Sequence, residues 1–142
     1  CMSKLEPGGD NSRLSPKAGF TSASPNVGIG YSTGAGGAVT QGVGRTTGVT
    51  LNTITGAITT DTASLAAEAS ANFTVTNSAV ALADTVILSI RSGSDGGNTA
   101  VEVNTVAAGS FVIKVANNNA AAGTAETGAI IINFAVIKAV TT

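Results

Sequence analysis

The residues of this chain that could do chemistry are few and widely spaced. The 142-residue sequence contains no histidine and a single cysteine, Cys1. A Ser-His-Asp triad, a Cys-His pair and a histidine-ligated metal site are therefore excluded. Two carboxylates could still hydrolyse a glycosidic bond, but such sites usually hold sugars against aromatic rings, which make up only 4% of the sequence. The carboxylates lie far apart along the chain, and we expect no enzyme; they are Glu6, Asp10, Asp61, Glu68, Asp84, Asp95, Glu102 and Glu126.

Several glycine-rich stretches resemble ligand-binding loops only superficially. Gly28-Ile29-Gly30 and residues 34–37 lack the full dinucleotide-binding pattern, and no Gly-Lys-Ser/Thr sequence follows them. Residues 93–98 could offer oxygen atoms to Ca²⁺, but their one carboxylate, Asp95, is too few for a dedicated site. Arg45 lies among threonines and glycines, where it could be a surface contact or a solvated loop residue. The sequence therefore predicts no cofactor and no metal.

Charged residues are sparse and nearly balanced. They make up 11% of the chain, against about 25% in an ordinary globular domain. The net charge is -1 and the Lys and Arg residues are scattered, so the basic surface of a nucleic-acid or membrane-surface binder is missing. Such low charge suits a surface that other subunits cover, because an isolated soluble domain usually carries more charge. We expect protein partners, with no nucleic acid and no membrane.

Cys1 stands directly before Met2, and a lone cysteine cannot form an intrachain disulfide. One interpretation is a lipidated amino-terminal cysteine of a bacterial surface lipoprotein. The other is a residue placed ahead of the natural start at Met2.

The strongest structural signal is the run of residues 129–138. Its β-branched side chains favour a pleated strand over a helix. Because both faces of the run are largely apolar, we predict a central strand covered on both sides, the second side by a loop, a neighbouring element or another subunit. Ile130, Ile132, Phe134 and Val136 fall on one face, and Ile131, Asn133, Ala135 and Ile137 on the other.

Short β-rich runs separated by turn signals precede this strand. Their number and spacing predict an all-β domain over residues 37–142, a β-sandwich or jelly roll of about seven or eight strands. Residues 107–110 have the composition of a hairpin turn, and residues 61–68 form either a short helix capped by Asp61 or a loop. The other expected strands are residues 38–43, 48–52, 57–60, 71–76, 85–91, 101–104 and 111–115.

Residues 1–36 differ in composition from the rest. They contain all three prolines among many glycines and serines, so a regular element is unfavourable there. Apolar residues nevertheless recur, and we predict an extended arm that lies on a neighbouring subunit; the alternative is a flexible terminus with incidental apolar residues. The candidate interface residues are Leu5, Leu14, Phe20, Val27, Ile29 and Tyr31.

Several phrases of the sequence resemble a block found in small structural proteins of tailed bacteriophages. Residues 34–41, 45–52 and 55–59 carry it, and it continues in residues 73–78, 106–111 and 133–138. The resemblance covers about residues 30–140 and marks no active site.

Among such proteins the sequence looks most like capsid decoration (cement) proteins. These are small β-sandwich or jelly-roll proteins, often trimeric, that sit on a capsid lattice. The resemblance thus implies a homo-oligomer on the outer surface of a virion capsid, with the major capsid protein as partner. A tail fibre or other tail module that binds the host surface stays an alternative, since those modules share the Thr/Gly/Ala-rich style.

Overall fold

The computed structural model describes residues 23–142, and the candidate interface residues Leu5, Leu14 and Phe20 lie outside them. Contacts divide the chain after Gly30. Residues 23–30 contain no strand and are exposed, while the unit from Tyr31 onward holds eight strands. No helix occurs among the described residues, so the all-β prediction is confirmed. The strands are β1 (Gly36–Thr40), β2 (Val49–Thr50), β3 (Thr55–Thr59), β4 (Ser70–Thr76), β5 (Thr85–Ser92), β6 (Thr99–Ala107), β7 (Ser110–Asn117) and β8 (Ile131–Ile137).

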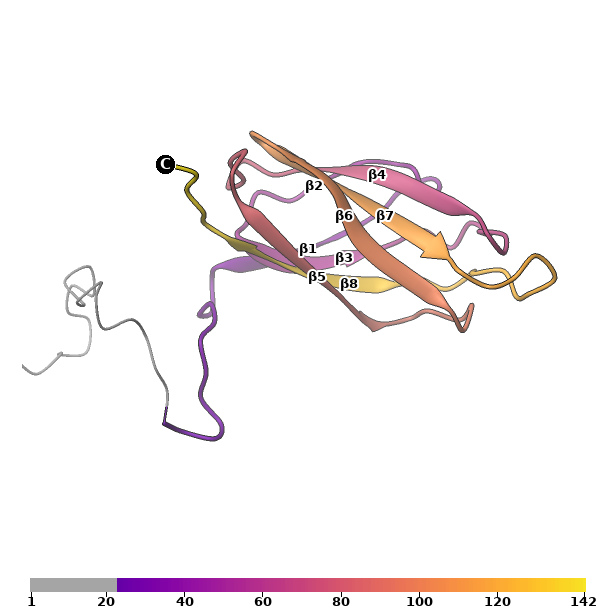
Figure 1. The fold of residues 1–142 in the computed structure, drawn as a ribbon, viewed down its shortest axis with the longest axis horizontal. Coiled ribbons are helices and arrows are strands. Elements are labelled where there is room, and N and C mark those ends of the chain that lie inside the picture. Colours follow the sequence, from indigo (N-terminus) through magenta and orange to yellow (C-terminus); the bar gives the residue numbers. More distant parts are fainter. Residues whose placement is uncertain (1–22) are drawn as a thin grey trace, which may run out of the picture. The chain divides into compact units, whose positions relative to one another are not determined.

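The strands form two mixed sheets of four, in the orders β1-β3-β8-β5 and β2-β4-β7-β6 (Figure 1). The pairs β1–β3 and β2–β4 are parallel, and the remaining pairs are antiparallel. The chain changes sheet at every connection except the β6–β7 hairpin. Both sheets are therefore linked repeatedly at each end of their strands.

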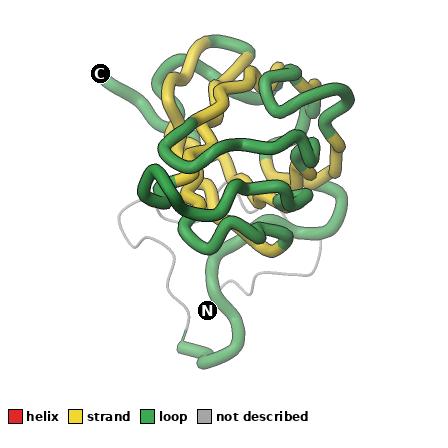
Figure 2. The backbone as a smooth tube through the Cα atoms, turned by 90° about the vertical axis from the view of Figure 1, so that its right-hand side faces the viewer, coloured by secondary structure: helices red, strands yellow, loops and turns green. Residues whose placement is uncertain are grey.

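The strands of this unit run between two ends, and we name each end after one residue that lies there. The odd-numbered strands finish at the Glu126 end, where residues 41–48, 60–69, 93–98 and 118–130 connect them onward. The even-numbered strands finish at the Lys138 end. Figure 2 faces the loops of the Glu126 end.

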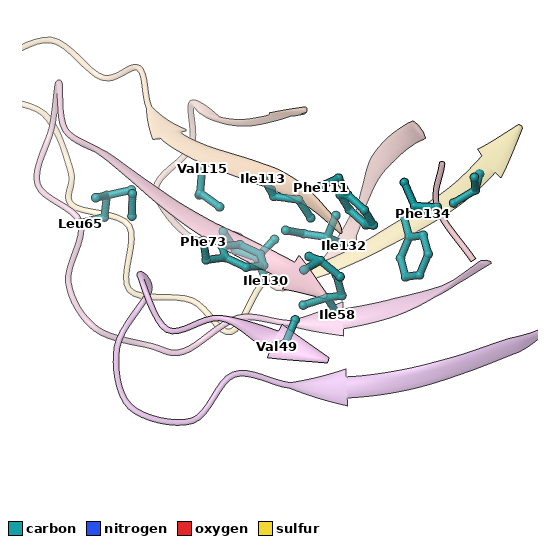
Figure 3. Close-up of a cluster of buried hydrophobic side chains, with 14 residues drawn as sticks. Val49, Ile58, Leu65, Phe73, Phe111, Ile113, Val115, Ile130, Ile132 and Phe134 are labelled. Carbon is teal, nitrogen blue, oxygen red and sulfur yellow. The ribbon is translucent and has the colours of Figure 1, made fainter. Parts of the chain in front are cut away.

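A single apolar core lies between the sheets (Figure 3). Both sheets contribute aromatic rings to it, and the centroids of Phe111 and Phe134 lie 5.4 Å apart at an interplanar angle of 55°. The four residues predicted for the inner face of the last strand are buried, with exposures from 0 to 2%. That strand, β8, is central as predicted, between β3 and β5. Its other face is only half-buried, and Ile137 is 49% exposed, so cover on both sides is not found within the described chain.

Several strand boundaries differ from the sequence prediction for a packing reason. Strand β1 begins at Gly36 and β3 at Thr55, where we expected them to begin at residues 38 and 57. A Cβ on Gly56 would lie 2.8 Å from the carbonyl oxygen of Gly37 and 2.8 Å from the Leu51 side chain. These glycines thus let two strands and a neighbouring side chain approach closely.

Residues 61–68 form a loop, which decides between the two alternatives for this segment. Asp61 caps no helix; its Oδ1 accepts the N–H of Ala63 two residues later, at 2.7 Å. Leu65 is buried and exchanges both backbone hydrogen bonds with Glu126, each at 2.9 Å. The hairpin turn is confirmed, with Gly109 at a φ of 81° between β6 and β7.

Candidate functional site

A buried carboxylate lies at the Glu126 end. The side chain of Glu126 is 0% exposed and is surrounded by five hydrogen-bond donors. These are the backbone N–H groups of Asp95 (3.0 Å), Gly96 (3.0 Å) and Gly128 (2.9 Å) and the hydroxyls of Ser94 (2.6 Å) and Thr99. Both carboxylate oxygens are thus engaged by the protein's own donors.

The pKa of Glu126 follows from these contacts. Burial raises the pKa of its carboxyl, but hydrogen bonds from Ser94, Thr99 and Asp95 together outweigh burial and hold the pKa well below its usual range. Glu126 is therefore ionised at neutral pH. An ionised carboxylate enclosed by donors is suited to holding loops in place and poorly suited to exchanging protons with a substrate.

Arg45 lies in the same end of the molecule, and its interpretation as a surface or solvated residue is wrong. It is only 4% exposed. Its guanidinium donates to the carbonyls of Glu126 (3.2 Å), Gly128 (2.9 Å) and Ala63 and to Oγ1 of Thr60 (3.2 Å). Arg45 thus contacts the backbone of Glu126, while the Glu126 carboxylate faces other donors.

These contacts tie all four connections of this end together. Arg45 comes from residues 41–48, Thr60 from 60–69, Asp95 from 93–98 and Glu126 from 118–130. We call these four residues the Glu126 cluster.

The side chain of Asp95 forms a second set of hydrogen bonds between residues 93–98 and residues 118–130. Its carboxylate accepts the N–H groups of Thr127 (2.7 Å) and Gly128 (2.9 Å) and the Thr127 hydroxyl (2.6 Å). Within residues 23–142, no group of three or more His, Cys, Asp or Glu residues could hold a metal ion. The hydrogen bonds between these connections make the Glu126 cluster a structural clasp.

The depressed pKa of Glu126 predicts that acid weakens the fold. In the unfolded chain Glu126 takes up a proton near its ordinary pKa of 4.5, whereas in the folded protein it stays ionised to a much lower pH. The unfolded state then binds more protons, so the free energy of unfolding falls as the pH drops from about 5.5 towards about 2. We expect Glu126→Gln to show a shallower decline in denaturant unfolding curves recorded across this range.

Asp84 leaves part of the pH dependence in that variant, because hydrogen bonds from Lys138 and Ala81 lower its pKa too. Identical slopes for the wild type and Glu126→Gln would contradict the role assigned to the buried carboxylate.

Exposed apolar side chains gather at the Lys138 end and on the adjoining outer face of the sheet that contains β8. Thr85 at the start of β5 pairs with Ile137 at the end of β8, and the Tyr31 hydroxyl donates to the Val136 carbonyl. Lys138 bridges from β8 to the 77–84 connection by pairing with Asp84. We call this set the apolar surface; it consists of Tyr31, Leu82, Ile87, Ile137 and Val140.

The outer face of the other sheet is more polar. Lys114 on β7 and Glu102 on β6 form an ion pair there, at 2.9 Å. A groove of about 390 Å³ lies beside it, lined by Glu68, Lys114 and asparagines of the 117–119 segment.

The predicted interface residues are distributed as follows. Val27 and Ile29 are exposed within residues 23–30, and Tyr31 belongs to the apolar surface. The other members of the apolar surface were not among the predicted interface residues. Ile137 carried a usable signal, because it falls on the second face of the run at 129–138; Leu82 and Val140 lie outside the strands and carried none.

Comparison of the chain with models of protein families, with curated proteins and with solved structures finds no match. Among the described residues, no helix is long and apolar enough to cross a membrane.

Proposed function

We propose that the protein is a non-enzymatic structural component of a bacteriophage virion, a capsid decoration protein that binds and stabilises the major capsid protein lattice from outside. One observation carries the proposal: in a chain with few charges, five of the eight large apolar side chains that are exposed among the described residues belong to the apolar surface. Exposed apolar patches on soluble proteins commonly mark sites of protein interaction. The resemblance of residues 34–41, 45–52 and 55–59 to phage structural proteins is the reason for proposing a virion component.

The mechanism we propose is adhesion through many weak contacts. A specific interface needs about 1,200 Å² of buried surface, and repetition over a lattice multiplies the effect of each contact. Within the proposal, the domain is a β-sandwich of the jelly-roll kind, the part of the predicted arm that precedes Tyr31 runs along a neighbouring subunit, and further copies of the chain are partners.

Two matched valines test whether the apolar surface is the binding surface. Val140 belongs to it and is 88% exposed, whereas Val43 lies at the Glu126 end and is 91% exposed. We expect Val140→Asp to reduce the copies bound per purified particle by about tenfold, which corresponds to about 1.4 kcal/mol. Quantitative mass spectrometry of particles from the phage that encodes the chain measures this number. Val43→Asp is expected to bind as the wild type does, and equal losses in both variants would count against the apolar surface.

Stoichiometry separates the capsid from the tail. A decoration protein is present in hundreds of copies per virion, whereas a tail fibre module is present in a handful. A handful of copies would favour the tail alternative and overturn the capsid location.

A further inference from the structure

Strand β1 is an edge strand that lacks the usual protection. Exposed sheet edges invite pairing with other chains, and proteins normally blunt them with charges, bulges or short strands. Three of the four edges here are blunted: β5 carries Arg91 and a bulge, β6 carries Glu102 and a bulge, and β2 has two residues. Strand β1 is five residues long, with the sequence GGAVT, in unbroken register with β3 and without charge or proline.

The free edge of β1 presents unpaired backbone groups. Gln41, just beyond β1, donates its N–H to Thr59 of β3 at 2.8 Å, and backbone groups alternate in direction along a parallel pair. The N–H and C=O groups of Gly36, Ala38 and Thr40 therefore point away from β3. All three residues are exposed, and no hydrogen bond joins these backbone groups to another described residue.

The segment just before β1 leaves this edge open. Tyr31 donates its hydroxyl to Val136 on β8, which lies on the far side of β3 from β1. The chain leading into β1 is thus held towards the middle of its sheet.

We infer that β1 pairs with β1 of a second copy of this chain, antiparallel and about a two-fold axis. With Ala38 opposite its own counterpart, Gly36 lies opposite Thr40, and every outward N–H and C=O of β1 meets a partner. A two-fold contact brings one surface against itself, and the absence of charge on β1 means that no like charges meet. The result joins two four-stranded sheets into one continuous sheet.

A second copy meets the needs of this edge better than an arbitrary strand does. The added strand must be extended and uncharged, and its own edge must have unpaired backbone groups. Strand β1 has all three properties. A five-residue edge is short, so the contact falls below the roughly 1,200 Å² of a standard interface. It therefore forms at high protein concentration, or on a lattice that raises the local concentration. The inference rests on the proposed assembly role, in which copies of the chain are partners.

Disulfide trapping tests the pairing. In a Cys1→Ser background, Ala38→Cys places two thiols opposite each other, and the Cα–Cα distance of about 5.5 Å for such a pair permits a disulfide. The matched control is Ala100→Cys, an exposed alanine on the bulged edge strand β6. We expect Ala38→Cys to form a cross-linked dimer at least about tenfold faster than Ala100→Cys under mild oxidation.

A proline supplies a second variant that blocks pairing. Thr40→Pro removes an outward N–H without removing a hydrogen bond to β3, so it is expected to abolish cross-linking of Ala38→Cys while circular dichroism shows a folded protein. Equal cross-linking rates for the two folded cysteine variants, or a trimer by sedimentation without an Ala38 cross-link, would overturn the inference.

The two proposals can fail separately in these experiments. Val140→Asp is expected to leave Ala38 cross-linking unchanged. If cross-linking is absent while Val140→Asp still loses particle binding, only the β1 contact is wrong. If cross-linking occurs while the protein is missing from particles, only the decoration role is wrong.

Discussion

Replacing Glu126 with alanine is expected to lower the free energy of unfolding by about 3–5 kcal/mol, because each buried donor left without a partner costs about 1–3 kcal/mol. The substitution strips the acceptor from three backbone N–H groups and two hydroxyls at once. Donors left buried without partners lose the hydrogen bonds that water gives them in the unfolded chain.

Glu102→Ala is the matched control for this loss. Glu102 is a glutamate with one ionic partner, Lys114, and its side chain is 61% exposed. An exposed ion pair of this kind contributes about 0–1 kcal/mol. Urea denaturation monitored by circular dichroism gives both values, and similar losses for the two alanine variants would show that the Glu126 clasp does not hold the end together.

Gly93→Ala is expected to have the second large effect. Gly93 has a φ of +88°, and a Cβ at this position would lie 2.0 Å from the carbonyl oxygen of Ala129. The left-handed backbone costs a residue with a Cβ about 1–2 kcal/mol, and overpacking against a fixed carbonyl adds about 1–3 kcal/mol. We expect the sum, about 2–5 kcal/mol, as a loss in the free energy of unfolding.

Gly97 separates the two contributions, because it shares the backbone conformation but not the crowding. Its φ is +81°, and nothing lies within 4 Å of a Cβ built on it. Gly97→Ala should therefore lose only the conformational part, about 1–2 kcal/mol. If Gly93→Ala and Gly97→Ala lost the same free energy of unfolding, the Ala129 carbonyl would have to move aside without cost.

The strands were predictable where alternation and β-branched residues coincide. Ile132 and Phe134 mark the inner face of β8, and Phe73 and Phe111 do the same in the other sheet; all four are buried. Alternating apolar residues predict which face of a strand is buried. The register between strands was not predictable, because it is set by partners distant in sequence.

The Glu126 cluster could not be predicted, because its members come from four separate connections. Arg45 and Glu126 are 81 residues apart, and each stands among threonines, alanines and glycines typical of solvated loops. The loop at residues 61–68 was undecided for the same reason. Its extended form depends on the hydrogen bonds that Leu65 exchanges with Glu126. Glu126 is distant in sequence, so the local sequence of the segment cannot indicate this partner.

The place of β8 in its sheet has a consequence for synthesis on the ribosome. It is the last of the eight strands to be made, yet it lies between β3 and β5 and forms antiparallel pairs with both. Until residue 137 emerges from the exit tunnel, β5 has no neighbour in its sheet, and the nascent chain can offer only the β1–β3 pair and the second sheet. Folding of this domain is thus completed after translation has passed β8, which leaves unfinished apolar strands for chaperones to shield in the interval.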